Sequence, residues 1–351
     1  MNRFLIASLT VALVANLTSP ADSAEVKERA KASPKPARTE ATIDPVEQEY
    51  EKLLELDDAA QDEVDKWIRE DKAFEAKGST LPQAMLNSRI EQRFAEVKKT
   101  YNSFLQKNPK HARARLAYGS FLNDIHEEDE AVTQWEKSRE IDPTNPAAWN
   151  NLANHYGHKG PILKAFDYYD KAIELNSKEP VYLQNLATTV YLFRDDAMGH
   201  YHITEEQVFA KALDLYRQAL KLDPKNFPLA TDLAQSYYGI KPLRTMEAIE
   251  AWEYAANVAN DSIEREGVYL HMARVELNSG LFDAARRHID AVTNQMYDVL
   301  KSRLARNLKE KEAKARKGTS LGTAEILGAI SNDTSKTSAP TTKANSESLS
   351  K

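Results

Sequence analysis

The amino-acid sequence predicts an all-α protein built from repeated helix pairs, on three observations. Apolar side chains recur three and four residues apart, which is the spacing of one face of an α-helix. One such run comprises Phe94, Val97, Tyr101, Phe104 and Leu105. Alternating β-branched runs bounded by turn residues, the signature of strands, are missing from the central part of the chain. Finally, Pro109 and Pro143 have the same separation as Trp149 and Leu183, so consecutive segments share one period.

The segment 1–24 has the composition of an export signal. Arg3 supplies a positive charge, the apolar run 4–17 follows, and the small residues Ala21, Ser23 and Ala24 offer a cleavage site. The apolar run is shorter than the ~20 residues that a transmembrane helix needs. We therefore predict a signal peptide at residues 1–24 and an exported mature chain, periplasmic in a Gram-negative source and secreted otherwise. An uncleaved signal that acts as an N-terminal anchor is the alternative.

Two flanking segments lack the large apolar side chains that a folded core requires. Residues 25–43 consist mainly of Ala, Lys, Pro and Glu, and residues 317–351 mainly of Ser, Thr, Ala, Lys and Gly. Such compositions cannot bury enough surface to offset the entropy lost on ordering. We predict a disordered linker at 25–43 and a disordered tail at 317–351, with one short amphipathic turn within 321–330.

The composition of the whole chain excludes several functions. The formal net charge of -6 and the pI near 5.9 argue against nucleic-acid binding, which rewards a clustered basic surface. The 351 residues include no cysteine. Disulfides, a lipid-bearing Cys, a thiol nucleophile and thiolate-bound zinc are therefore excluded.

The repeated segments share a pattern of large and small apolar positions. The copy at residues 146–179 shows it most completely, with Trp149, Leu152, Ala153, Tyr156, Gly160, Ala165, Tyr169, Ala172 and Leu175. The other copies span residues 112–145, 180–226, 227–261 and about 266–299. With its period of about 34 residues, this pattern resembles that of the tetratricopeptide repeat family, W-x₂-L-G-x₂-Y followed by A-x₃-F and P. The resemblance implies five helix pairs over residues 112–299, stacked as a right-handed superhelical α-solenoid with a concave peptide-binding groove.

Small side chains such as Ala153 and Ala187 are expected where the two helices of a pair approach closely. Large side chains then fill the space between neighbouring pairs. Because one pair cannot bury its apolar face alone, the copies must stack. In the fifth copy Glu276 occupies a slot that is meant for an aromatic residue.

Helical segments flank the repeats and are expected to cap them. The N-terminal cap, 44–111, comprises expected helices at 44–78 and 83–107. The first of these is strongly acidic, with a local excess of Asp and Glu over Lys and Arg. Its Asp57 and Asp58 are expected to be solvated, without the burial that tunes a carboxyl for acid–base catalysis.

At the other end of the repeats, one long helix is expected from Leu281 to about Lys317. Residues 300–316 are then its end, and its last turns are basic.

The third copy carries an insertion at about 191–211. The interval from Pro143 to Pro224 is longer than two repeat periods of about 34 residues each, and the excess falls in this segment. The insertion contains His200 and His202 in a predicted loop, for which a structural or partner-contacting role is favoured. A zinc site and catalysis are the alternatives. No catalytic motif occurs elsewhere, and we predict no enzyme activity, no cofactor and no metal.

The resemblance also places exposed positions of the first helix of each copy on the concave face. Carried over slot by slot, these residues are Arg113, Asn150, Asn151, Asn154, Gln184, Asn185, Thr188, Asp232, Gln235, Tyr238, His271 and Arg274. Asn151, Asn185 and Asp232 share one slot, which resembles the asparagine ladder of the O-linked N-acetylglucosamine transferase repeats. A side-chain amide offers both a donor and an acceptor, matching a peptide unit. The alternative is that Asn is a common residue in that slot of ordinary repeats.

A carboxylate clamp of the chaperone-binding type fits less well. Asn154 and Asn185 match its asparagines, but Asn150, Pro228 and Asp232 stand where it requires Lys or Arg. Selective capture of a C-terminal carboxylate is therefore not expected.

We expect an exported protein-binding scaffold or adaptor that holds an extended peptide or a partner helix in the groove. A non-catalytic specificity or regulatory subunit of a cell-envelope enzyme complex is the alternative. An enzyme in its own right would require a metal in the insertion. The expected partner is a protein or peptide, with no nucleic acid and no membrane span after signal cleavage.

Overall fold

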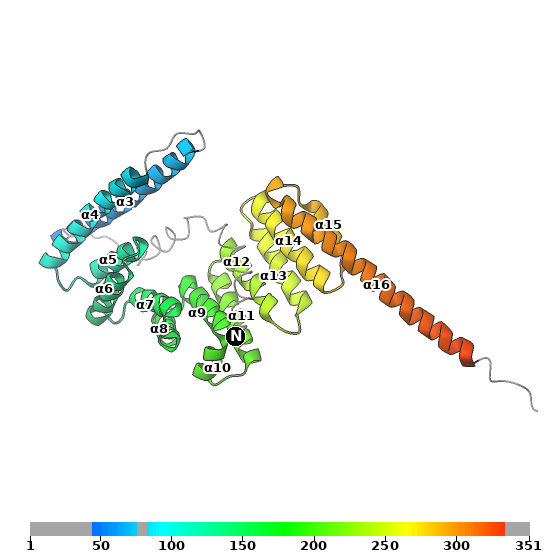
Figure 1. The fold of residues 1–351 in the computed structure, drawn as a ribbon. Coiled ribbons are helices and arrows are strands. Elements are labelled where there is room, and N and C mark those ends of the chain that lie inside the picture. Colours follow the sequence, from blue (N-terminus) through cyan, green and yellow to red (C-terminus); the bar gives the residue numbers. More distant parts are fainter. Residues whose placement is uncertain (1–43, 76–82, 334–351) are drawn as a thin grey trace, which may run out of the picture. The chain divides into compact units, whose positions relative to one another are not determined.

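The computed structural model describes residues 44–75 and 83–333, which are largely helical (Figure 1). No strand occurs in these ranges, and the all-α class predicted from the sequence is confirmed. The predicted signal peptide 1–24 and linker 25–43 lie outside the described residues, as does the end of the predicted tail, 334–351. Over the described ranges, no helix combines the length and the apolar character that crossing a bilayer requires.

The chain divides into two compact units, residues up to Pro224 and residues from Lys225. The helices of the first unit are α3 (Pro45–Glu75), α4 (Gln83–Lys107), α5 (Ala112–Asp124), α6 (Glu128–Ile141), α7 (Pro146–Lys159), α8 (Ile162–Leu175), α9 (Pro180–Leu192), α10 (Arg194–Tyr201) and α11 (Glu205–Leu222). Those of the second unit are α12 (Phe227–Ser236), η1 (Tyr237–Gly239), α13 (Thr245–Val258), α14 (Ser262–Asn278), α15 (Phe282–Ala291), η2 (Gln295–Tyr297) and α16 (Asp298–Asp333).

Five helix pairs follow one another along the chain, as the repeat pattern predicts. In the first unit the pairs are α5 with α6, α7 with α8, and α9 with α11, and in the second they are α12 with α13 and α14 with α15. We call the first helix of each pair helix A and the second helix B. Successive pairs adjoin within each unit, through α6 and α7, α8 and α9, and α13 and α14. This is the arrangement of a tetratricopeptide-type α-solenoid.

Several helices begin at residue types that are typical of helix starts, namely Asn at the cap and Pro at the first position. Asn145 caps α7 by accepting a hydrogen bond from the backbone N–H of Ala147, and Asn226 caps α12 in the same way. Pro146 and Pro180 occupy the first positions of α7 and α9, where a missing N–H costs no helical hydrogen bond. These signals fix where helix A of three successive copies begins.

The pairs pack through two recurring slots, one small and one large. The small slot of helix A holds Gly119, Ala153, Ala187, Ala234 and Ala273, and the four alanines are fully buried. The large slot of helix B holds Trp135, Tyr169, Tyr216, Trp252 and Ile289, all buried. Gly119 shows why the first slot must be small, because a Cβ added there would lie 2.5 Å from two atoms of the Trp135 ring. Protein interiors have no spare volume for such an overlap.

The N-terminal cap is the hairpin of α3 and α4, with one correction to the expected surface of α3. Asp57 is not solvated but only 7% exposed, and its carboxylate accepts hydrogen bonds from Tyr101 Oη at 2.7 Å and Gln61 Nε2 at 2.6 Å. Asp57 lies on the helical face of Leu53 and Ala60, which are buried, so the apolar stripe carries it into the core. Burial, and then the charge of Asp57, raise the pKa of Tyr101 well above its ordinary value.

The insertion at 191–211 is not the predicted loop. It contains the helix α10, and Thr204 then begins α11 through a capping box with Gln207. α10 packs on α8, where Tyr201 Oη donates a hydrogen bond to Asp170 at 3.0 Å. α10 has 8 residues and only Ala197 is buried among them, so no helical period of apolar residues marks it in the sequence.

The single long helix predicted from Leu281 to about Lys317 starts where predicted, at Phe282, but it is interrupted and it ends later than predicted. α15 ends at Ala291, and α16 begins at Asp298 after the turn η2. α16 then continues to Asp333, past residue 316, where a disordered tail was predicted. The glycines of this stretch lower helix propensity by about 1 kcal/mol each, but unlike proline they do not block the backbone hydrogen bonds.

A carboxylate from another helix stabilises the break before α16. Glu266 of α14 accepts hydrogen bonds from the backbone N–H groups of Asn294 and Thr293, at 2.7 and 2.8 Å, and from Thr293 Oγ1 at 2.8 Å. The bond from Asn294, followed by those from Thr293, holds the pKa of Glu266 below its ordinary value. The chain turns at this point because its backbone donors find a partner outside their own helix.

We expect Ala153→Leu to destabilise the first unit by about 1–3 kcal/mol, the usual cost of overpacking a close contact. The fully buried Ala153 lies at the approach of α7 to α8, and each pair also supports its neighbours. Thermal and urea unfolding measure the effect. Ala95→Leu is the matched control, because Ala95 is exposed on α4. Equal stability of the two variants would show that the slot is misassigned.

Candidate functional site

The predicted concave-face residues fall in both units, and each group is described by itself. The first unit carries Arg113 on α5, Asn150, Asn151 and Asn154 on α7, and Gln184, Asn185 and Thr188 on α9. The second unit carries Asp232 and Gln235 on α12, Tyr238 in η1, and His271 and Arg274 on α14. Each group holds side chains that contact one another.

A row of amide side chains crosses the three A helices of the first unit. Asn185 Nδ2 on α9 donates to Asn150 Oδ1 on α7 at 3.0 Å, and Asn150 Nδ2 lies 3.5 Å from Asn151 Oδ1. Asn151 Nδ2 in turn donates to Ser120 Oγ on α5 at 3.3 Å. Asn150 is only 2% exposed, whereas Asn151 and Asn185 are half-buried. These two residues therefore keep part of their surface exposed, and both contact the buried Asn150.

Asn154 and Thr188 are bound by tyrosines from helix B. Tyr169 Oη on α8 donates to Asn154 Oδ1 at 2.5 Å, and Tyr216 Oη on α11 lies 2.8 Å from Thr188 Oγ1. Burial raises the pKa of Tyr169, so its phenol remains a neutral donor. The hydroxyl of Thr188 also contacts the backbone oxygen of Gln184 at 3.0 Å. The structure thus uses part of the hydrogen-bonding capacity of Asn154 and Thr188 within the fold.

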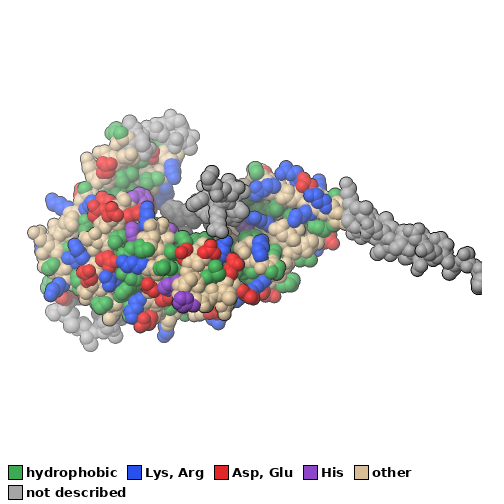
Figure 2. Space-filling view, turned by 60° about the horizontal axis from the view of Figure 1, so that its bottom comes forward, with side chains coloured by type: hydrophobic (Ala, Val, Ile, Leu, Met, Phe, Trp, Pro, Cys, Tyr) green, Lys and Arg blue, Asp and Glu red, His purple; other side chains and the backbone are tan. Residues whose placement is uncertain are grey.

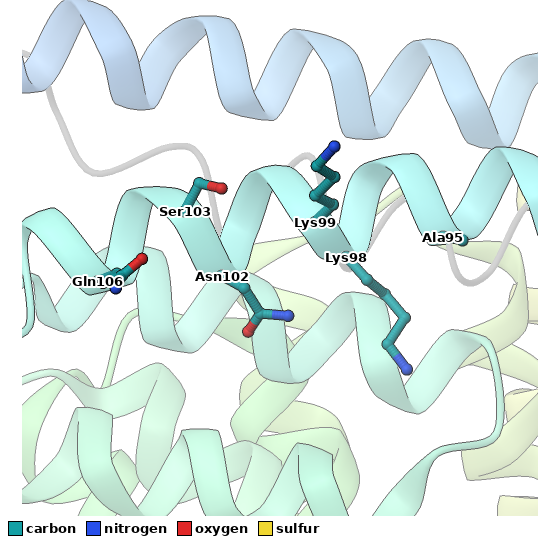
Figure 3. Close-up of a pocket in the computed structure, with 6 residues that line it drawn as sticks. All are labelled: Ala95, Lys98, Lys99, Asn102, Ser103 and Gln106. Carbon is teal, nitrogen blue, oxygen red and sulfur yellow. The ribbon is translucent and has the colours of Figure 1, made fainter.

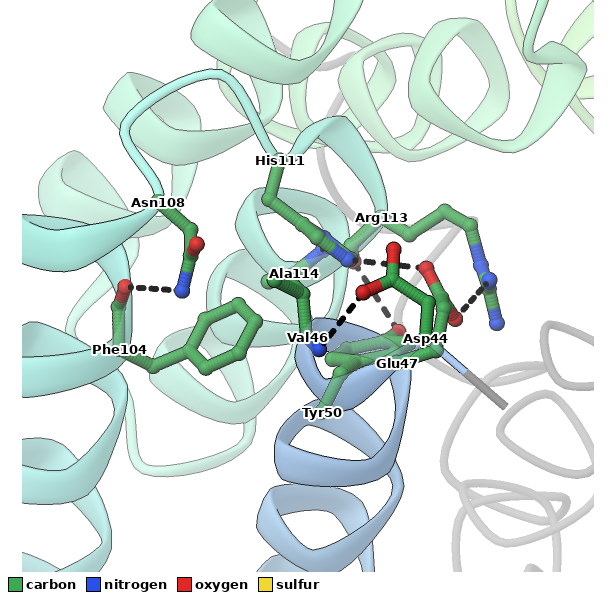
Figure 4. A network of polar contacts seen from close by, with 9 residues as sticks. All are labelled: Asp44, Val46, Glu47, Tyr50, Phe104, Asn108, His111, Arg113 and Ala114. Carbon is green, nitrogen blue, oxygen red and sulfur yellow. Dashed lines mark hydrogen bonds and ion pairs between the residues drawn. The ribbon is translucent and has the colours of Figure 1, made fainter. Parts of the chain in front are cut away.

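Arg113 is engaged by the cap helix α3. Its Nη1 lies 2.8 Å from Glu47 Oε2, and its guanidinium lies 4.9 Å from the centre of the Tyr50 ring. Figure 4 shows Glu47 between Arg113 and His111, whose Nε2 is 3.3 Å from Glu47 Oε1. His111 Nδ1 accepts the backbone N–H of Ala114 and so caps α5. The start of α3 therefore contacts this end of the predicted face, while Arg113 itself stays exposed.

In the second unit, Tyr238, His271 and Arg274 form one cluster with Trp252. Tyr238 Oη lies 3.1 Å from His271 Nδ1. The His271 ring stacks on Trp252 with 4.4 Å between centroids and 12° between planes. The Arg274 guanidinium lies 4.8 Å from the centre of the Tyr238 ring, within the range of a cation–π contact.

Burial governs the ionisation of this cluster. It lowers the pKa of His271 to about 4, with a smaller contribution from the charge of Arg274, so the imidazole is neutral at pH 7. Burial also raises the pKa of Tyr238. Asp232 and Gln235 are half-buried on α12. The cluster offers stacked rings with one exposed cation, Arg274, at its edge.

Sequence reasoning missed four residues that shape these faces, namely Ser120, Tyr169, Tyr216 and Trp252. Ser120 stands one repeat period before Asn154, and Asn154 stands one period before Thr188. The same slot rule that selected Asn154 and Thr188 would have found it. The repeat pattern placed Tyr169 among the packing residues, and no sequence signal shows that any of the three aromatic residues also contacts polar side chains of helix A.

Two side chains of the insertion, His200 and Tyr201, contact α8. His200 Nε2 lies 3.6 Å from Asp167 Oδ1, and the His200 ring packs on Phe166 with 5.2 Å between centroids. In the part of the chain that the structure describes, no group of three or more His, Asp or Glu side chains is placed to hold a metal ion.

A shallow depression of about 650 Å³ lies along α4 (Figure 3). It is lined by Ala95, Lys98, Lys99, Asn102, Ser103 and Gln106. None of these side chains is buried, so nothing fixes the orientation of a ligand there. Figure 2 shows acidic, basic and apolar side chains interspersed over one face of the molecule, without the continuous basic field that nucleic-acid backbones require.

No protein-family model matches the chain, and no curated protein sequence matches it. Solved structures do match. MamA is 22% identical, with 49% of this chain and 92% of that chain covered and a TM-score of 0.39. PilW, a type IV pilus biogenesis factor, is 14% identical, with 64% and 96% covered and a TM-score of 0.48. YrrB, a TPR protein with an unusual peptide-binding site, is 14% identical, with 59% and 97% covered and a TM-score of 0.46. At these low values the fold is established by the helix pairs of the chain itself.

We expect the stability of the second unit to fall between pH 6.5 and pH 4 because of His271. Its folded pKa of about 4 lies below the unfolded value of about 6.5. In this window the unfolded chain therefore binds a proton that the folded chain does not. The contribution is complete above pH 6.5 and amounts to about 1–3 kcal/mol, discounted because the residue keeps some solvent contact.

Denaturant unfolding of the wild type and of His271→Phe at several pH values measures this contribution. Phenylalanine preserves the stacking on Trp252 but cannot be protonated, so the variant is expected to lose less stability on acidification. Parallel stability curves for the two proteins would contradict the assignment.

Proposed function

We propose that this chain is an exported, non-catalytic scaffold or adaptor that holds an extended peptide against the A helices of its first unit. The observation that carries the proposal is the amide row from Asn185 through Asn150 and Asn151 to Ser120. Export is supported by the signal-like composition of residues 1–24.

The amides of the row are suited to a peptide backbone. Each side chain has two N–H donors and a carbonyl oxygen with two lone pairs, and the contacts along the row use one N–H of each of Asn185, Asn150 and Asn151. Asn151 and Asn185 retain a second N–H and spare carbonyl capacity for a ligand. A peptide unit also combines one donor with one acceptor, so such contacts would favour backbone over any particular side chain.

The fixed geometry of the row supports binding energetically. Immobilising a free polar side chain on binding costs about 0.5–1.5 kcal/mol. Asn151 and Asn185 are already ordered by their hydrogen bonds to Ser120 and Asn150, so less of this cost remains. Asn150 is the buried link between them, and we assign it a positioning role.

We expect Asn151→Ala combined with Asn185→Ala to weaken peptide binding about five-fold to a hundred-fold, from two hydrogen bonds worth about 0.5–1.5 kcal/mol each. The ligand is obtained by crosslinked pull-down from the cell-envelope fraction, and its binding segment is then titrated as a synthetic peptide by calorimetry. Gln106→Ala with Gln218→Ala is the matched control, because these two exposed amides lie outside the row.

Salt dependence separates this proposal from capture by charge. Exposed charges are screened over about 8–10 Å at physiological ionic strength, whereas neutral amide contacts are not. Unchanged affinity in the double variant, together with binding that disappears as salt is raised, would contradict the amide proposal and favour the acidic helix α3.

A further inference from the structure

We propose that the first unit carries a second docking surface, an apolar groove with an acidic rim between the α3–α4 hairpin and the α5–α6 turn. Its occupant is an amphipathic helix of a partner protein that presents one or two apolar side chains flanked by Lys or Arg. This groove is separate from the amide row and does not depend on the function proposed for it.

The groove arises from a mismatch in helix length. α3 has 31 residues and α4 has 25, whereas α5 and α6 have 13 and 14. At 1.5 Å per residue, α3 is about 46 Å long and α5 about 20 Å. The first repeat can therefore cover only part of the hairpin.

The contacts of α3 and α4 with the first repeat show which part of the hairpin is left uncovered. Near the start of α3, Tyr50 Oη donates to the backbone oxygen of Arg113 in the first turn of α5. On α4, the Tyr101 ring stacks on Tyr118 of α5 with 4.7 Å between centroids. Towards the α5–α6 turn, Lys98 Nζ reaches Glu127. α5 ends at Asp124 and α6 begins at Glu128, so neither helix continues along the hairpin beyond this turn.

The groove at this place has an apolar floor. It has a volume of about 840 Å³ and is lined by both helices of the hairpin and by the α5–α6 turn. Its large apolar residues are Val64 and Ile68 on α3, Ile90 and Phe94 on α4, and Ile125 in the turn. Of these five only Val64 is buried, and the other four retain solvent contact. Covering them would release apolar surface from water.

The rim of the groove is predominantly acidic. Its charged residues are Asp65, Glu91, Asp124, Glu127 and Glu128, against the single cation Lys98. Two of these carboxylates are paired with lysines: Lys98 Nζ lies 2.5 Å from Glu127 Oε2, and Lys159 Nζ lies 3.1 Å from Glu128 Oε2. Asp65 and Glu91 are exposed on the two sides of the floor, so the rim keeps a negative charge directed towards an incoming ligand.

Shape and charge together select the occupant. Val64 and Ile68 are four residues apart on α3, as are Ile90 and Phe94 on α4, so the floor is about one helical turn long. A floor of this length accepts apolar anchors at positions i and i+4 of a helix. The acidic rim favours Lys or Arg beside these anchors and disfavours acidic segments, through both encounter rate and register.

Two helical probe peptides of equal length test the proposal on the full chain. One carries Leu at positions i and i+4 flanked by Lys, and the other has Glu in place of every Lys. Fluorescence anisotropy is expected to show binding of the Lys peptide only. The groove variants are Ile90→Asn, which disrupts the floor, and Asp65→Asn with Glu91→Gln, which neutralises the rim without changing its shape.

Controls match each change outside the groove. Leu163→Asn alters an exposed Leu of α8 that is 49% accessible, and Glu55→Gln with Glu253→Gln removes the same charge from exposed sites. We expect the rim variant to bind about two- to thirty-fold more weakly, from two exposed charge pairs, and the floor variant about tenfold or more. The controls should bind as wild type, with equal melting temperatures throughout.

Two results would overturn the proposal. In the first, the rim variant and its charge control lose affinity for the Lys peptide equally, while Ile90→Asn binds it as wild type does. That result would mean that the peptide is attracted by the net charge of the protein alone. The other is self-association of the full chain in sedimentation that disappears in Ile90→Asn, which means that a second copy of the chain fills the groove.

Discussion

The close approach of the two helices in each pair is the constraint on which the rest of the structure depends. At Gly119 there is no room for a Cβ beside Trp135, and the equivalent alanines of the later copies are fully buried. Because the residue of helix A at this slot has little or no side chain, the large side chain of helix B packs directly against the backbone of helix A. Tyr169 and Tyr216 stand in that large slot, and their hydroxyls contact Asn154 and Thr188. Packing of the pair therefore also orders polar side chains of the candidate site.

The sequence pattern predicted the parts of the fold that recur. The period located all five pairs and both slots, because each slot is filled by the same kind of residue in successive copies. Even Glu276, the exception in its slot, is 3% exposed as a core residue would be, with its carboxylate 2.8 Å from His288 Nδ1. A charged side chain is tolerated at a buried position when a hydrogen-bonding or charged partner lies beside it.

Features that occur once could not be read from the pattern. The break between α15 and α16 depends on Glu266 meeting Thr293 and Asn294, which are remote from it along the chain. The pairing of Glu47 with Arg113 likewise joins the cap to the first repeat. For the candidate site, the slots gave the predicted polar residues, but neither Ser120 nor the hydrogen bonds that connect the row. That these residues bind a peptide stays a prediction.

The two surfaces proposed for the first unit differ in chemistry. The amide row is neutral and ordered by its own hydrogen bonds, so it suits a backbone of varied sequence. The groove of the hairpin combines an apolar floor with an acidic rim, so it suits a narrower class of partner. A scaffold with both could hold two ligands at once, with only one of the two contacts sensitive to salt.

Amide hydrogen exchange in Gly119→Ala tests the packing constraint most directly, because two effects of this substitution have opposite signs. Alanine is about 1 kcal/mol more favourable than glycine in a helix, which alone would slow exchange in α5. The contact with Trp135 predicts instead faster exchange in α5 and α6 and in the adjoining α4 and α7, with α12 to α16 unchanged. Slower or unchanged exchange in α5 and α6 would contradict the account.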